Sequence, residues 1–332
     1  MAVLITGGTG YIGSHTVVEM LNNDYEVIIV DNLSNSKIDV LDKIYKITGK
    51  KVKFYQYDLC DETLVDKLFN ENKIDAVIHF AGLKAVGEST MKPIEYYYNN
   101  ILSTLNLIKV MKKNDVKKII FSSSATVYGK QDKFPIEEGF KLNEPTNPYG
   151  KTKLYIENIL KDLYKSDSSW DITLLRYFNP IGAHESGLIG EVPNGIPNNL
   201  MPYINQVATG KREKLFVFGN DYDTVDGTGV RDYIHVCDLA YGHLCALKHL
   251  KGLNIYNLGT GNGYSVLEIV KAYERVNNVK IKYEIAPRRE GDIDTCYASP
   301  KKAEDEIGFK CTRDLDEMCR SSYNFEKKNN KL

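Results

Sequence analysis

Short apolar runs alternate with longer helical patterns through the first half of the chain. Runs that are apolar at nearly every position are typical of parallel strands, because helices cover both faces of a parallel sheet. We therefore expect an α/β fold with a doubly wound parallel sheet of the Rossmann type. The expected strands are residues 2–6, 26–30, 52–56, 76–80 and 118–122, with helices between them, the first over residues 11–21.

The pattern changes after another expected strand at residues 172–175. Residues 179–199 are rich in glycine, proline and asparagine, which predicts a long loop. We expect residues 1–178 to form the main domain, to which some later segments return, and residues 179–332 to form mainly a smaller mixed α/β lobe. The lobe's expected strands are residues 215–218, 255–258 and 280–285, and its expected helices are residues 266–276 and 314–325.

Two expected helices of the main domain, residues 101–111 and 149–163, have broad apolar faces. In the second, apolar residues recur at the i, i+3, i+4 and i+7 spacing from Ile156 to Leu163. Helices with such faces are buried on two sides. The pattern leaves two explanations open, which are deep burial inside one subunit and burial between the sheet and a partner subunit.

The composition is that of an ordinary globular protein, with 42% hydrophobic and 26% charged residues. A formal net charge of -1 gives no reason to expect nucleic acid or an acidic membrane as a partner. The N-terminus lacks the features of a signal peptide, and no segment approaches the roughly 18 apolar residues of a membrane helix. The 6 cysteines are dispersed without a Cys-x-x-Cys pair, which favours reduced thiols, a cytoplasmic location and no metal site.

A glycine-rich segment joins the first expected strand to the first expected helix. Its residues from Gly7 to Gly13 match both G-x-G-x-x-G and G-x-x-G-x-x-G. Such glycines let the backbone approach a pyrophosphate at a helix N-terminus, where unpaired N–H groups favour anions. Asp31, after the second expected strand, can accept hydrogen bonds from ribose hydroxyls and would repel a 2′-phosphate. The segment therefore predicts a dinucleotide site that prefers NAD to NADP.

Tyr149 and Lys153 lie four residues apart in a helix that Pro148 is well suited to begin. Such residues share a helix face, so we expect the ammonium group to lower the pKa of the phenol from its usual value of about 10. A Tyr-x-x-x-Lys spacing also arises by chance on helices. Downstream of a dinucleotide loop, however, it predicts nicotinamide chemistry with a phenolate as the base.

Other positions at strand ends are less decisive. Asp58 is able to bond an adenine amine or to cap the helix that begins after Cys60. The turn of small residues at 80–82 lets a dinucleotide lie against the backbone. Lys84, next to this turn, has three interpretations: a cofactor contact, a substrate diphosphate contact, or an exposed surface lysine.

Long stretches of the sequence resemble one known family. They cover residues 6–15, 77–89, 121–129, 175–180, 195–202 and 226–235, and so run nearly end to end. On these residues the chain resembles the extended short-chain dehydrogenases/reductases and, within them, the UDP-glucose 4-epimerase family. The resemblance implies an NAD-dependent epimerase that interconverts UDP-glucose and UDP-galactose through a 4-keto intermediate.

The resemblance also implies a site, in which Tyr149 is the base, Lys153 its partner and Ser124 the third catalytic residue. The main domain would bind NAD. With the glycine loop, its implied cofactor residues are Gly7, Gly10, Tyr11, Ile12, Gly13, Asp31, Asn32, Asn35, Ser36, Asp58, Leu59, Phe80, Ala81, Gly82, Lys84, Asn99, Ser122, Tyr149, Lys153, Tyr177 and Phe178.

The lobe would mainly bind the UDP-hexose. The implied substrate residues are Lys84, Ser124, Tyr149, Asn179, Asn199, Leu200, Phe216, Val217, Phe218, Arg231, Tyr233, Arg289, Asp292 and Cys296. The two arginines suit a diphosphate, because a guanidinium offers paired donors. Phe216 and Phe218 alternate along a strand, so one ring can lie on uracil, although both can equally pack in the core.

Two rival functions depend on individual residues. Related 4,6-dehydratases carry Asp-Glu just after the serine that matches Ser124, and related decarboxylases tend to carry glutamate at the second of these positions. Here the two residues are Ala125 and Thr126. Non-catalytic NAD-sensing relatives typically lose the tyrosine and lysine that this chain keeps.

Family comparison places Cys296 at a wall beside the sugar 2-position, where a bulky tyrosine is associated with rejection of N-acetylated sugars. Cysteine leaves room, so we expect turnover of UDP-N-acetylglucosamine and UDP-N-acetylgalactosamine as well. A slip of one residue would place Tyr297 there instead. A separate alternative is that Cys296 is a buried structural thiol. The resemblance finally implies a homodimer built by the two helices with broad apolar faces.

Overall fold

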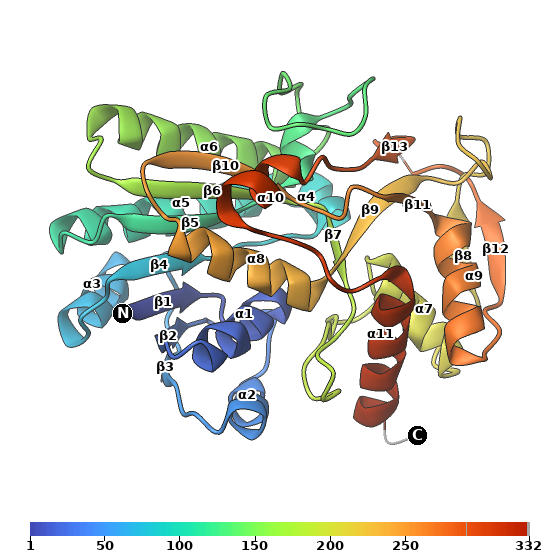
Figure 1. The fold of residues 1–332 in the computed structure, drawn as a ribbon, viewed down its shortest axis with the longest axis horizontal. Helices are drawn as coiled ribbons and strands as arrows, with labels where there is room; N and C mark the ends of the chain where they lie inside the picture. Colours follow the sequence, from blue (N-terminus) through green and yellow to red (C-terminus); the bar gives the residue numbers. More distant parts are fainter. Residues whose placement is uncertain (290, 331–332) are drawn as a thin grey trace. The chain divides into compact units, whose positions relative to one another are not determined.

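The computed structural model describes residues 1–289 and 291–330. The chain divides into two compact units, coloured along the sequence in Figure 1. The first unit consists of Met1–Gly129, Lys141–Tyr177 and Ala240–Tyr256. The second unit consists of Lys130–Phe140, Phe178–Leu239 and the described residues from Asn257 onward.

A seven-stranded sheet is the frame of the first unit, with the strand order β10-β6-β5-β4-β1-β2-β3. The neighbours from β6 to β3 pair in parallel, and β1 and β4 are buried at every position. This confirms the Rossmann-type fold expected from the continuous apolar runs. The strands are β1 (Ala2–Thr6), β2 (Glu26–Val30), β3 (Lys53–Tyr55), β4 (Ala76–His79), β5 (Lys118–Ser124), β6 (Asp171–Tyr177) and β10 (Leu253–Leu258).

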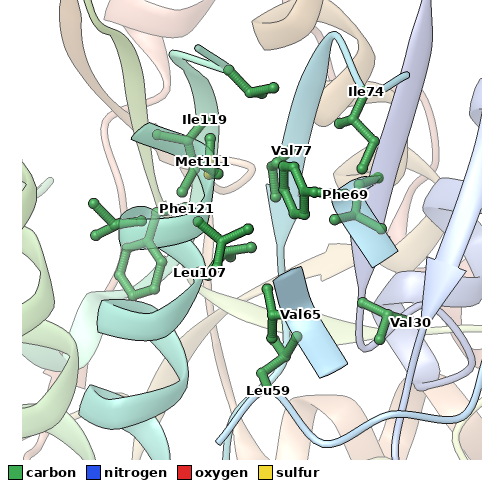
Figure 2. Close-up of a cluster of buried hydrophobic side chains, with 14 of the residues drawn as sticks. Val30, Leu59, Val65, Phe69, Ile74, Val77, Leu107, Met111, Ile119 and Phe121 are labelled. Atoms are coloured by element: carbon green, nitrogen blue, oxygen red, sulfur yellow. The ribbon is translucent and has the colours of Figure 1, made fainter. Parts of the chain in front are cut away.

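Helices with apolar faces cover this sheet. Side chains of α3, α5 and α6 form one hydrophobic core with the strands, and part of this core is shown in Figure 2. Helix α1 packs against β1 and β2. The bounds are α1 (Tyr11–Asn22), α2 (Val40–Thr48), α3 (Glu62–Glu71), α4 (Val86–Met91), α5 (Pro93–Lys113), η1 (Ala125–Tyr128), α6 (Pro148–Ser166) and α8 (Val236–Lys248).

The second unit is built around β9 (Val230–His235). This strand pairs with β7 (Asn179–Ile181), β11 (Gly263–Ser265) and β13 (Thr295–Cys296), while β8 (Leu215–Phe218) pairs with β12 (Tyr283–Ala286). A separate core joins these strands to the helices. The helices are α7 (Leu200–Ala208), α9 (Val266–Asn277), α10 (Lys301–Ile307) and α11 (Leu315–Asn330).

One expected strand lies in a different sheet from the one anticipated. Residues 255–258 were expected in the smaller lobe, but β10 lies next to β6 at the edge of the seven-stranded sheet. The apolar pattern of a strand does not specify which strand it pairs with. Here the partner of β10 is β6, about 80 positions earlier in the chain. The strand β9 and the helices α7 and α8 had no counterpart among the expected elements.

Candidate active site

The helix α6 begins immediately before Tyr149, at Pro148. Asn147 caps it, because its side-chain oxygen accepts a hydrogen bond from the backbone N–H of Gly150 at 2.9 Å. One turn later lies Lys153. We call Tyr149 and Lys153 the Tyr–Lys pair; their shared helix face agrees with the spacing in the sequence.

Lys153 is buried, with 6% of its surface exposed. Its Nζ donates a 2.6 Å hydrogen bond to the carbonyl oxygen of Ser122 at the end of β5. The same Nζ lies 5.9 Å from the centroid of the Tyr149 ring and 4.8 Å from that of Phe121. Burial lowers the pKa of Lys153 to about 7, because the charged ammonium group loses its hydration.

The pKa of Tyr149 differs from the sequence-based expectation. Burial raises it above its usual value, and a hydrogen bond with the Ser124 hydroxyl opposes this only partly. We expected Lys153 to lower the pKa, but that ammonium group is itself disfavoured by the same burial. Because the Lys153 Nζ lies 5.9 Å from the Tyr149 ring, we expect an anionic Tyr149 to favour a protonated Lys153, and the reverse.

The glycine loop provides close backbone approach at the start of α1. Gly7 has φ +69°, and its N–H donates to the carbonyl oxygen of Val30 at 2.8 Å. A Cβ at Gly13 would lie 2.2 Å from the Gly7 carbonyl oxygen, so only glycine fits there. The N-cap residue Gly10 has no capping side chain, and Tyr11 and Ile12 begin the helix. This geometry fits the diphosphate of a dinucleotide, held by backbone N–H groups at a helix N-terminus.

Asp31 follows β2 and is held in a fixed orientation. Its carboxylate accepts hydrogen bonds from Thr9 N at 3.2 Å, Leu33 N at 2.9 Å and Ser36 Oγ at 3.1 Å. Ser36 Oγ lies 2.7 Å from the Thr9 hydroxyl, which ties the segment with Asn35 to the glycine loop. A carboxylate fixed beside this loop fits the ribose of the same dinucleotide.

Asp58 lies after β3 and next to the buried Leu59. It accepts hydrogen bonds from Asn32 Nδ2 at 3.1 Å and from Cys60 N at 2.8 Å. The alternative that Asp58 caps the next helix is wrong, because Asp61 is the N-cap residue of α3 and accepts from the backbone there.

The turn after β4 is fixed by two side chains that sequence reasoning missed. Asn100 on α5 is buried; its Oδ1 accepts from Leu83 N at 2.7 Å, and its Nδ2 donates to Leu83 O at 3.0 Å. The ring of His79 lies between Thr6 Oγ1 at 2.8 Å and Thr104 Oγ1 at 3.0 Å. A search for polar residues inside apolar helix and strand patterns would have found both.

The remaining candidates of this turn lie around those two side chains. Phe80 and Ala81 follow β4, and Ala81 N donates to Thr6 Oγ1 at 3.1 Å. Asn99 donates to Asn100 Oδ1 at 3.0 Å. Gly82 has φ +158°, and Lys84 Nζ lies 5.9 Å from the centroid of the Tyr11 ring, next to the glycine loop.

Tyr177 ends β6 and is buried in the first unit. Its hydroxyl hydrogen-bonds to His243 on α8 and to Ser122, and burial raises its pKa well above the usual value. The ring of His243 packs on Phe80, with 4.8 Å between centroids. Phe178, the first residue of the second unit after β6, is also buried, and its N–H donates to Leu258 O at 3.2 Å.

In the second unit, β8 presents two exposed aromatic rings. Phe216 and Phe218 are 37% and 39% exposed, whereas Val217 between them is buried in the core. Core packing of the two rings is therefore excluded. Arg289 lies over the Phe218 ring, with 4.9 Å from the guanidinium carbon to the centroid, and donates to Asp292 Oδ2 at 2.9 Å.

Arg231 on β9 belongs to the same neighbourhood. Its Nη1 donates to the carbonyl oxygen of Val230 at 2.8 Å. Burial raises the pKa of Tyr233 to about 12, while the charges of Arg231 and Arg289 lower it. The structure thus brings two guanidinium groups, a buried phenol and an exposed ring together, which is a chemistry suited to a nucleoside diphosphate.

Asn179 on β7 lies opposite Tyr233 on β9. Asn199 is the N-cap residue of α7, immediately before Leu200, and its Nδ2 donates to Glu191 Oε1 at 2.6 Å.

Cys296 on β13 is the strand partner of Arg231. It is 8% exposed, and burial raises the pKa of its thiol to about 11. The next residue, Tyr297, stacks its ring on Phe134, with 5.4 Å between centroids.

Metal-binding clusters and membrane-spanning helices are both absent among residues 1–289 and 291–330. No group of three or more His, Cys, Asp or Glu side chains there could hold a metal ion. No helix in this part of the chain has the length and hydropathy needed to cross a membrane.

Comparison with known proteins identifies the family. A family model described as GDP-mannose 4,6 dehydratase matches residues 4–322. UDP-glucose 4-epimerase of Bacillus subtilis (strain 168) is 59% identical over 332 residues, which cover 99% of this chain and 98% of the relative.

Solved structures agree. The crystal structure of UDP-glucose 4-epimerase from Bifidobacterium longum, in complex with NAD+ and UDP, has a TM-score of 0.97 and 57% identity, with 99% of each chain covered. The UDP-Glc/GlcNAc 4-epimerase of Campylobacter jejuni has a TM-score of 0.85 and 38% identity, covering 98% of this chain and 99% of that one. The chain therefore belongs to the UDP-glucose 4-epimerase family of the extended short-chain dehydrogenases/reductases.

Proposed function

We propose that this protein interconverts UDP-glucose and UDP-galactose by transient oxidation of the sugar at carbon 4. The observation that carries the proposal is the contact of Ser124 with Tyr149 and the burial of Lys153 beside the same ring. Full-length similarity to UDP-glucose 4-epimerases supports it.

The cofactor is NAD, which supplies the hydride acceptor and donor when bound. The residues that would hold it are the glycine loop, Asp31 with Ser36 and Asn35, Asp58 with Asn32, and the turn that follows β4. Their backbone donors and fixed carboxylates fit a dinucleotide without a 2′-phosphate.

Tyr149 is the acid–base group of the reaction. As phenolate it takes the proton of the sugar 4-hydroxyl, and it later returns that proton to the same oxygen. The Ser124 hydroxyl donates to the phenolate, and Lys153 gains a proton when Tyr149 loses one. Since burial penalises each charge alone, the ion pair is the favourable charged state of this site.

The UDP group is held in the second unit. Arg231 and Arg289 bind the diphosphate, one of the exposed rings Phe216 and Phe218 stacks on uracil, and Asp292 accepts from the uridine ribose. Asn179, Asn199, Leu200, Val217 and Tyr233 complete the substrate residues. An anchor at UDP leaves the 4-keto sugar free to turn over, which reversal of configuration requires.

Elimination is disfavoured as the reaction, although the matching family model takes its description from a dehydratase. The positions after Ser124 are Ala125 and Thr126, which carry no carboxylate to drive loss of the 6-hydroxyl. Appearance of a stable 4-keto-6-deoxy sugar would reverse this assignment.

We also propose a substrate range, an oligomeric state and a location for this protein. Cys296 beside Arg231 leaves space for N-acetylated sugars. A homodimer forms through α5 and α6, on which Ile94, Tyr98 and Tyr155 are exposed. The reaction takes place in the cytosol, where all six cysteines remain free thiols as they are in the structure.

The test is an assay of purified protein with UDP-galactose and no added NAD. We expect UDP-glucose to form, and we expect Tyr149→Phe to retain NAD while losing activity by at least ~10³-fold. Near-normal turnover by a cofactor-loaded Tyr149→Phe would contradict the proposal.

A further inference from the structure

The three serines that end β5 each bond to α6. Ser122 and Ser124 contact the Tyr–Lys pair, as described above. The middle residue, Ser123, donates a 2.6 Å hydrogen bond to Glu157 Oε1. Since Glu157 lies one turn beyond Lys153, one face of α6 is fixed to the strand end at three successive turns.

Glu157 is held by more than this one hydroxyl. Arg176 on β6, the strand partner of Ser123, donates to it twice: Nε to Oε1 at 2.9 Å and Nη2 to Oε2 at 2.7 Å. The two side chains are 0% and 1% exposed. Lys161 adds a contact of 3.1 Å to Oε2 from the next turn of the helix. The guanidinium carbon of Arg176 lies 4.7 Å from the centroid of the Tyr128 ring, in the η1 segment that follows Ser124.

A buried ion pair of this kind is weak evidence for stability, because desolvation offsets the attraction between the charges. Its two parallel hydrogen bonds do fix geometry, since a guanidinium fork donates to both oxygens of a carboxylate in one orientation. The fixed elements here are α6, β5 and β6, which carry the Tyr–Lys pair, Ser124 and Tyr177.

We propose that Glu157, Ser123 and Arg176 are positioning residues for the Tyr–Lys pair. They fix α6 against the end of β5, so that the Ser124 hydroxyl stays in contact with Tyr149 and the Ser122 carbonyl with Lys153. This inference rests on the proposed function, but concerns residues outside the cofactor and substrate candidates named above.

Proton transfer at the Tyr–Lys pair depends on the geometry that this network fixes. Displacement of Tyr149 or Lys153 by a fraction of an ångström weakens proton transfer, which is sensitive to geometry. We expect UDP binding to be retained, because the diphosphate candidates Arg231 and Arg289 have their hydrogen bonds to Val230 and Asp292 and not to this network. Loss of positioning therefore lowers kcat and raises the pH of the acid limb of the kcat profile, while KM stays constant.

Two substitutions test this without changing charge. Glu157→Asp retains the carboxylate but withdraws it by one methylene, and Ser123→Ala removes only the hydroxyl link. We expect each to lower kcat on the order of tenfold and to shift the acid limb upward. The matched control is Ile172→Ala in the core of β6, which destabilises the same unit without removing a hydrogen bond of the network.

The measurements are kcat and KM for UDP-galactose across pH, NAD content and the unfolding temperature of each variant. Positioning is supported if both test variants have a lower kcat and an acid limb shifted to higher pH, while the acid limb of Ile172→Ala is unshifted. A lower unfolding temperature with wild-type kcat and pH profile overturns it, as does the same kinetic change in the control. If the wild-type protein itself lacks epimerase activity, the proposed function fails first and this inference falls with it.

Discussion

At the scale of single residues, burial determines the charge of the site. The sequence predicted correctly that Tyr149 and Lys153 share a helix face, because helical spacing is local. It predicted the sign of the phenol's pKa shift wrongly, because the depth of burial depends on strands far away in the chain. Glu157, Arg176, Asn100 and His79 were missed for the same reason: the partners that fix them lie in other elements, distant in the sequence.

Burial of Lys153 predicts a dependence of stability on pH. Its pKa of about 7 lies below the ordinary value of 10.5, so the unfolded chain binds more protons between these pH values. The free-energy cost of burying the charged amine is complete below about pH 7 and disappears toward pH 10. The contribution of Lys153 to stability therefore rises with pH. The free energy of unfolding of wild type relative to Lys153→Met should rise on the order of 4 kcal/mol across this interval.

Denaturant unfolding at several pH values checks this prediction. Lys165→Met, on the same helix but with a side chain 75% exposed, is the control and should follow wild type. If the free energies of unfolding of wild type and Lys153→Met changed with pH in parallel, burial of the charged amine would cost no stability.

Cys296 gives a second residue-scale prediction, on substrate choice. Its thiol is buried next to Arg231, one of the two arginines proposed to bind the diphosphate. A tyrosine at this position would occupy space beside that arginine. We expect Cys296→Tyr to lose turnover of UDP-N-acetylgalactosamine by at least ~10-fold relative to UDP-galactose, and Cys296→Ala to keep both. Equal activity ratios in wild type and Cys296→Tyr, with both folded, would reject the assignment.

At the scale of elements, the apolar runs predicted nearly all strands of the main sheet within two residues. They failed where a strand depends on partners that are distant in the sequence. The strand β9 has charged residues inside its run, Arg231 and Asp232, and was not recognised. Asp232 is buried because backbone N–H groups of Thr260, Gly261 and Ala298 donate to it, and those partners are distant in sequence.

The glycine loop makes an element-scale prediction. An alanine at Gly13 would place its Cβ 2.2 Å from the Gly7 carbonyl oxygen and so displace the start of α1. We expect Gly13→Ala to purify with less than about a tenth of the wild-type NAD content, because the anion site requires that helix start. Gly139→Ala is the control, since no atom lies within 4 Å of a Cβ there. Cofactor released by denaturation is measured by absorbance, and full NAD in Gly13→Ala would exclude this role for the loop.

At the scale of the whole molecule, an exposed apolar face remains on α5. Ile94, Tyr98 and Leu105 are 74%, 65% and 44% exposed, and they lie on one side of the helix at spacings of four and seven residues. Tyr155 of α6 is also exposed and stacks its ring on Tyr97 of α5, with 6.1 Å between centroids. The sequence showed that these helices have broad apolar faces, but could not divide them into a side that meets the sheet and a side that does not.

A second copy of the chain is the occupant we propose for this face, since two long helices give an extended and self-complementary surface. Tyr98→Asp places a carboxylate in its middle and should convert a dimer into a monomer, as measured by light scattering at micromolar concentration. Tyr45→Asp is the matched control, because Tyr45 is also exposed, at 48%, but belongs to α2. We expect this variant to keep the mass of a dimer and its activity. A monomeric wild type, or the same mass change in both variants, would show that the face of α5 does not join two copies.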